Sequence, residues 1–159
     1  MYWTTHIAVG ALLGSRSRSR LSALAMGAIS HPLLDTIPHY DFKNKIFSAG
    51  DFIIGLALLN LLVDDRDNSK IILGALGGGA PDIEGGLVYF HLISKRRAYF
   101  HKLFPHSKTS LARALVQESL IIAAAYLIVK NNQKKPPSNP AFVLPVRFKL
   151  NSVPLRPKS

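Results

Sequence analysis

The chain has 159 residues, a length that fits one domain with its own core, and 48% of them are hydrophobic. It contains no cysteine, which excludes disulfides and thiolate metal sites, so any bound metal must be held by nitrogen and oxygen ligands. The formal net charge is +11, and it is unevenly placed, because the seven basic residues from Lys130 onward are accompanied by no acidic residue.

Short apolar segments separated by polar joints predict helices along most of the chain. Before residue 140, no run alternates between apolar and polar residues as a half-buried strand would. The expected helices cover residues 4–14, 19–30, 48–63, 70–81, 84–95 and 109–129. Thr4 or Thr5 is the expected N-cap of the first helix, and Ser48 that of the third, which carries Asp51 in its first turn. We therefore predict an all-α fold, a compact bundle of about six short apolar helices.

The composition changes abruptly after Val129. The stretch "KNNQKKPPSNP" is polar and rich in proline, so it offers little apolar area to offset the entropy of ordering it. We predict a helical domain over residues 1–130 and a mostly disordered basic tail over residues 131–159. The first residues, "MYWTTHIAVGALLG", lack the basic region and long apolar stretch of a secretory signal, so no cleavable signal is expected.

The apolar helices leave two environments open. The runs "FIIGLALLNLLV" and "SLIIAAAYLIV" have 12 and 11 residues, fewer than the roughly 20 that a membrane-spanning helix needs, which favours a buried helical core. Several helices are apolar on all faces, however, which is typical of burial in a larger core or in lipid. The basic segments "SRSRSR" and "SKRR" and the tail would then contact anionic head groups. The protein is thus either membrane-associated on the cytoplasmic side or cytoplasmic, and its oligomeric state is open.

Histidines and carboxylates gather in the stretch "SHPLLDTIPHYD", which contains His31, Asp35, His39 and Asp41. Asp35 is four residues from each of the two histidines, and side chains four apart lie on the same face of an α-helix, close enough to share one ion. Pro32 and Pro38 disfavour helical dihedral angles in the residues before them. We therefore expect a broken helix that still brings the three groups together.

Other candidate ligands lie at helix ends and loops. His6 is in the first helix, Asp82 and Glu84 are in the glycine-rich "GGGAPDIEGG", and His106 is in "FPHSK". Each has a plain structural explanation by itself: His6 as a core histidine, Asp82 as an N-cap, and His106 as an exposed loop residue. Their joint occurrence at the joints between apolar helices, where helical bundles hold metals, predicts a metal site.

These motifs resemble two related families. "HPLLDTIPH" is similar to a segment of the zinc-dependent phospholipase C enzymes and of the fungal single-strand nucleases, which are all-α enzymes with a zinc cluster. With "THIAVGALLG", "GALGGGAPDIEG" and "PHS", residues 4–108 more closely resemble the LexA-regulated membrane-bound metal-dependent hydrolases. That family has an early histidine-containing helix, a "PD.D" segment and a "THS" segment. Here Glu84 stands at the second acid of "PD.D", and Pro105 stands at the threonine of "THS".

The resemblance implies a metal-dependent hydrolase. It implies metal-ligand roles for six residues: His6, His31, Asp35, His39, Asp82 and His106. Asp41 or Glu84 would act as the general base or would orient the ligands. Nitrogen and oxygen ligands suit one or two Zn²⁺ ions, with Mn²⁺ or Fe²⁺ as alternatives. A metal-activated water would then cleave a phosphoester of a phospholipid or a nucleic acid. The competing interpretation is a non-catalytic helical protein that attaches to a membrane or a partner.

Overall fold

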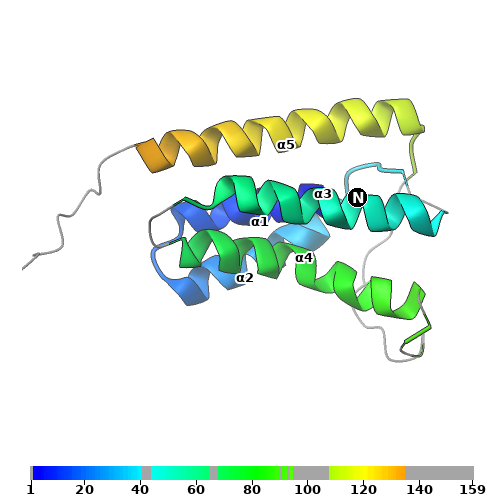
Figure 1. The fold of residues 1–159 in the computed structure, drawn as a ribbon, viewed down its shortest axis with the longest axis horizontal. Coiled ribbons are helices and arrows are strands. Elements are labelled where there is room, and N and C mark those ends of the chain that lie inside the picture. The colour runs from blue at the N-terminus through cyan, green and yellow to red at the C-terminus, as the bar shows by residue number, and fades with distance from the viewer. Residues whose placement is uncertain are drawn as a thin grey trace, which may run out of the picture.

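A computed structural model describes residues 2–40, 44–64, 68–89, 91–92, 94 and 108–134 of the chain. This part contains five helices: α1 (Trp3–Arg16), α2 (Arg20–Asp35), α3 (Lys45–Leu62), α4 (Ser69–Tyr89) and α5 (Leu111–Lys134). The helices run side by side along the long axis of the molecule (Figure 1). The described residues form no strand beyond an isolated bridge between His39 and Lys108, so the predicted all-α fold is confirmed.

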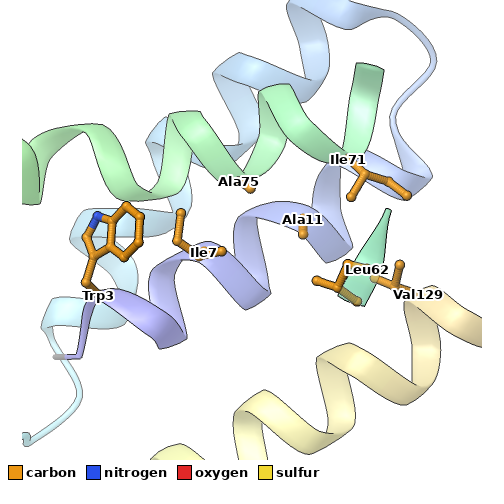
Figure 2. Close-up of a cluster of buried hydrophobic side chains, with 7 residues drawn as sticks. All are labelled: Trp3, Ile7, Ala11, Leu62, Ile71, Ala75 and Val129. Atoms are coloured by element: carbon orange, nitrogen blue, oxygen red, sulfur yellow. The ribbon is translucent and has the colours of Figure 1, made fainter. Parts of the chain in front are cut away.

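Helix α1 is the centre of the bundle, because it packs against all four other helices. Figure 2 shows its apolar face meeting side chains from α3, α4 and α5 in one cluster. This cluster contains Trp3, Ile7 and Ala11 of α1, Leu62 of α3, Ile71 and Ala75 of α4, and Val129 of α5. Most of these side chains are small or aliphatic, and the residues of α1 between them are also largely buried. The core therefore lies around α1, and the outer helices bury only one face each.

Glycines allow α1, α2 and α4 to approach one another backbone to backbone. A Cβ atom on Gly10 of α1, or on Gly27 of α2, would collide with the carbonyl oxygen of Gly74 in α4. Gly77 and Gly78 of α4 have similarly close neighbours on α2 and α1. Small residues at such positions let helices pack without intervening side chains, as they commonly do in membrane proteins.

Gly74→Ala is expected to destabilise the fold by about 1–3 kcal/mol, which is typical of overpacking. The added methyl group would collide with the Gly10 carbonyl oxygen and would lie 2.8 Å from the Gly14 Cα atom, both of which belong to backbone that cannot rotate away. Gly86→Ala in the same helix is the matched control, because no atom lies within 4 Å of its added Cβ; it is expected to stabilise the helix by about 0.5–1 kcal/mol. Equilibrium unfolding in detergent measures both, and equal stabilities would contradict the packing argument.

The number of helices differs from the prediction because α4 is continuous. The expected helices 70–81 and 84–95 form one helix, Ser69–Tyr89, so the described residues contain five helices and not six. Gly77 and Gly78 remain helical because their missing side chains make room for α2 and α1. Pro81 lies inside the same helix.

Helix α2 is also longer than expected. It begins after Ser19, whose side chain forms a capping box with Ser22, and it continues through Pro32 to Asp35. The expected break at Pro32 is therefore wrong, and His31 and Asp35 lie on one continuous helix. Packing against α1 and α4 along its length compensates for the backbone hydrogen bond that proline cannot donate.

The N-caps of α1 and α3 differ from those predicted. Helix α1 begins at Trp3 with Tyr2 in the N-cap position, and Tyr2 makes no side-chain capping hydrogen bond. Helix α3 begins at Lys45, and the side chain of Asn44 accepts a hydrogen bond from Ile46 N at 2.9 Å. Thr4, Thr5 and Ser48 are thus inside helices and not at their starts.

Helix α5 crosses the predicted domain boundary at residue 130 and ends at Lys134. Its last turn is anchored, because Gln133 Nε2 donates a hydrogen bond of 2.6 Å to the carbonyl oxygen of Leu62 at the end of α3. Residues 131–134 therefore belong to the helical domain. The rest of the predicted tail, residues 135–159, lies outside the described residues.

Three helices are long and apolar enough to cross a membrane: Lys45–Leu62, Ser69–Val88 and Leu111–Lys134. Their 18, 20 and 24 residues correspond to about 27, 30 and 36 Å at about 1.5 Å per residue, against a bilayer core of about 30 Å. Only 11% of α3 is buried in the structure. Its outer face carries Ile46, Phe47, Ile53, Ile54 and Leu61, all more than half exposed. These helices are longer than their uninterrupted apolar runs, because the polar residues at their ends are also helical. The expected cytoplasmic side stays a prediction.

Candidate metal centre

Four of the six predicted ligands converge at one end of the bundle. His6 comes from α1, His31 and Asp35 from α2, and Asp82 from α4. The Nε2 atoms of His6 and His31 lie 3.2 Å from Asp35 Oδ1 and Oδ2, respectively. The same two atoms lie 3.7 and 3.8 Å from the two carboxylate oxygens of Asp82. Donor atoms of His6, His31 and Asp82 all lie within 4.8 Å of one another.

Close packing at Gly78 brings the three helices of the cluster together. A Cβ atom on this residue would collide with the carbonyl oxygen of His6, so the glycine lets α4 approach α1 at the site. The Gly78 carbonyl oxygen also accepts a hydrogen bond of 2.8 Å from His31 Nδ1. Asp35 follows His31 by one helical turn and therefore faces the same side of α2.

The hydrogen bond from His31 decides which of its nitrogens is available. A carbonyl oxygen only accepts, so Nδ1 carries the hydrogen, and in the neutral ring Nε2 has a lone pair. This lone pair points toward carboxylate oxygens of Asp35 and Asp82, which also carry lone pairs. Such an arrangement requires a shared cation, either a proton or a metal ion. Ligating histidines in metal sites typically donate their other ring N–H to a carbonyl or carboxylate in this way.

His6 is fully buried, and its ring stacks on that of His31 with centroids 3.9 Å apart and an interplanar angle of 23°. Neither of its ring nitrogens makes a well-oriented hydrogen bond with the described residues, although Nε2 is close to both carboxylates. Leaving a buried polar group without such a bond is costly. Two stacked imidazoles also disfavour a positive charge on both rings at once.

The two imidazoles have different electrostatic environments. Burial lowers the pKa of His6 to about 4, and the nearby Asp35 only partly opposes this effect. Burial also lowers the pKa of His31, but contact with Asp35 and the charge of Asp82 outweigh it and raise the pKa above its usual value. Burial raises the pKa of Asp35, but contact with His31 and His6 dominates and holds it well below its usual range. The cluster therefore favours an ionised Asp35 that faces a single positive charge.

The spacing of the donor atoms fits a metal ion. Ligand atoms about 2.0–2.2 Å from a tetrahedral ion lie about 3.4 Å from one another. The four distances between the imidazole Nε2 atoms of His6 and His31 and the carboxylate oxygens of Asp35 and Asp82 run from 3.2 to 3.8 Å. Two carboxylates would balance the charge of a divalent cation, and imidazole with carboxylate suits Zn²⁺. The side chain of Asp82 is 21% exposed, against 6% for Asp35, so the cluster opens toward solvent on the α4 side.

Of the other predicted site residues, the structure describes His39 and Glu84, and neither belongs to the group of donor atoms formed by His6, His31 and Asp82. His39 is buried, and its Nδ1 donates a hydrogen bond of 2.9 Å to the Ile37 carbonyl oxygen. Glu84 lies two residues after Asp82 on α4, which turns the two side chains about 200° apart around the helix axis. Its predicted role as a general base stays a prediction. Asp41 and His106 lie outside the described residues.

Two carboxylates near the site were not recognised from the sequence. Asp51 of α3 and Glu118 of α5 accept hydrogen bonds from the first residues of α1, just before His6. The sequence predicts Asp51 only in the first turn of its own helix, and Glu118 directly precedes the apolar run "SLIIAAAYLIV". An acidic residue inside a long apolar helix is itself a signal, because such residues are costly to bury and usually have a specific partner.

The comparisons with known proteins identify no relative. No family model, no curated protein and no solved structure matches the chain. The fold and site therefore define a class by their own geometry: a small helical bundle with long apolar helices and a buried cluster of two histidines and two aspartates at one end.

Proposed function

We propose that this protein is a membrane-bound, metal-dependent hydrolase that cleaves phosphoesters. The observation that carries the proposal is the convergence of two imidazole Nε2 atoms on two carboxylates inside a buried cluster. The motifs that resemble the metal-dependent hydrolases contain all four of these residues.

In this proposal His6, His31 and Asp82 supply the ligand atoms, since their donors lie within 4.8 Å of one another. Three protein ligands are the number that a catalytic zinc site takes, leaving one position open. Asp35 faces the same two Nε2 atoms and adds the second negative charge beside the ion. The chemistry that Zn²⁺ supplies in such a site is a nucleophilic hydroxide at neutral pH. The Gly78 carbonyl holds His31 in the tautomer that ligation needs.

The depth of the site favours a lipid phosphoester as the substrate. Asp82 lies seven residues before the end of α4, or about 10 Å along the helix axis. If the three long apolar helices cross the membrane, the cluster lies near one surface of the bilayer. Its more exposed side chain, Asp82, belongs to one of these helices. A phospholipid brings its phosphoester to this level, whereas a nucleic acid would have to leave the aqueous phase.

The proposal predicts that the purified protein binds Zn²⁺ or Mn²⁺ and that His31→Asn loses at least 90% of the bound metal and of the activity. His31→Asn removes one ligand, and His91→Asn is the matched control, because His91 is exposed beyond the cluster and has a φ of 62° that asparagine tolerates. Elemental analysis in detergent gives metal content. Hydrolysis of phospholipid vesicles and of an oligonucleotide, each with and without added metal, gives activity.

Each outcome of this experiment separates two interpretations. Wild-type protein without bound metal would contradict the metal site. Bound metal without cleavage of any phosphoester would favour the non-catalytic membrane protein that the sequence left open. Cleavage of the oligonucleotide but not of the vesicles would overturn the lipid assignment and leave the hydrolase assignment standing.

A further inference from the structure

The first turn of α1 is held from outside by a carboxylate of α3. Asp51 Oδ2 accepts a hydrogen bond of 2.6 Å from the backbone N–H of Trp3, and Oδ1 accepts one of 3.3 Å from the N–H of Thr4. The Thr4 hydroxyl also donates to Asp51, at 2.6 Å to Oδ1 and at 2.8 Å to its backbone carbonyl. One residue of α3 thus satisfies two of the backbone donors that a helix start leaves without intrahelical partners.

A second carboxylate, from α5, holds the same turn. Glu118 is 1% exposed, and its Oε2 accepts hydrogen bonds of 2.8 Å from the backbone N–H of Tyr2 and from the hydroxyl of Thr5. Burying an acidic side chain this deeply is costly unless it is specifically bound. The positive end of the helix dipole and two donors offset that cost. Glu118 and Asp51 therefore contact the helix start from two different elements.

These contacts matter for the site because α1 has no cap of its own. Its N-cap residue, Tyr2, makes no side-chain capping bond, and its first turn contains no acidic residue. His6 directly follows Thr5, and its backbone N–H bonds to the Tyr2 carbonyl oxygen at 3.4 Å. Side chains of α3 and α5, which contribute no ligand to the described cluster, thus hold the turn that immediately precedes His6.

We propose that Asp51 and Glu118 are positioning residues that hold the first turn of α1 and thereby place the His6 imidazole in the metal centre. The expected effect on metal binding rests on the proposed function. The expected effect on the position of the His6 ring rests only on the hydrogen bonds described above. The proposal assigns to one buried carboxylate, Glu118, and one half-buried carboxylate, Asp51, a role in the same site without direct contact with the ion. Mutation of residues that orient metal ligands typically lowers the metal affinity 10–100-fold.

Thr5 offers a matched pair of variants that tests the proposal. Thr5→Val keeps the shape and removes the hydroxyl that donates to Glu118, whereas Thr5→Ser keeps the donor. In full-length protein in detergent, Thr5→Val is expected to weaken Co²⁺ binding about tenfold and to shift the ligand-field absorption of the bound ion. Thr5→Ser should bind as the wild type does. Glu118→Gln, which removes the charge, should act in the same direction as Thr5→Val.

A control and a metal-free measurement keep the proposal separate from the proposed function. Asp64→Asn changes a carboxylate beyond the far end of α3, where Asp64 Oδ1 accepts from Asn68, and should leave Co²⁺ binding unchanged. In metal-free protein labelled with ¹⁵N-histidine, Thr5→Val should shift the ring resonances of His6 and leave those of His91 in place. Absence of Co²⁺ binding in the wild type would overturn the proposed function only. Unshifted His6 resonances, or folded Thr5→Val and Glu118→Gln proteins with wild-type affinity, would overturn the positioning role.

Discussion

Asp35→Asn is expected to lower the affinity for Zn²⁺ by at least tenfold, and hydrolysis with it, while the helices stay folded. Asp35 places one oxygen 3.2 Å from each imidazole Nε2 atom, so it is the group that faces both histidines of the cluster. Asparagine has nearly the same size, but it removes a negative charge that faces the cation at short range. In a buried site the screening of that charge is weak, and its loss is felt strongly.

Glu84→Gln is the matched control for this prediction. Glu84 is a half-buried carboxylate of α4 that points away from Asp82, so its amide should leave metal affinity unchanged. A fall in turnover at unchanged metal content would instead support the general-base role predicted for Glu84. Competition with a chromophoric chelator measures affinity, and circular dichroism checks the fold. If Asp35→Asn binds metal as tightly as the wild type, Asp35 does not contribute to a metal centre.

Ile54→Arg is expected to lower the equilibrium constant for membrane insertion about a hundredfold. Ile54 lies at the middle of α3 and is 60% exposed. An arginine at the centre of a spanning helix costs about 3 kcal/mol on insertion scales, and each 1.4 kcal/mol is a factor of ten. On the surface of a protein in water, the same exchange would change stability by about 0.5 kcal/mol or less. The variant therefore separates a membrane helix from an exposed helix of a soluble bundle.

Ile46→Arg controls for the added charge. Ile46 is 77% exposed and lies in the first turn of α3, where an arginine side chain can reach the head groups. It should insert nearly as the wild type does. Resistance of the protein to alkaline extraction from membranes measures insertion for both variants. Equal extraction of Ile54→Arg and wild type would show that the middle of α3 does not face lipid.

Local sequence patterns were sufficient for the class of fold and for part of the site. Apolar segments bounded by polar joints indicate helices, and the described residues are helical without strands. The four-residue spacing of His31 and Asp35 placed them on one face of a helix, where the structure also has them. Such features depend on residues within one or two turns of each other, so they can be read without knowing what packs against them.

Tertiary structure decided what short-range patterns do not encode. His6 and Asp82 reach His31 and Asp35 because glycines of α4 lie directly against the backbones of α1 and α2. The same packing keeps α4 helical through "GGGAP", where propensity alone predicts an end. Helix α1 starts one or two residues before the threonines expected to cap it, because its caps are side chains 48 and 116 positions away in the chain. Close backbone approach and caps from other helices are long-range contacts, and they stabilise the helices only once the bundle has assembled.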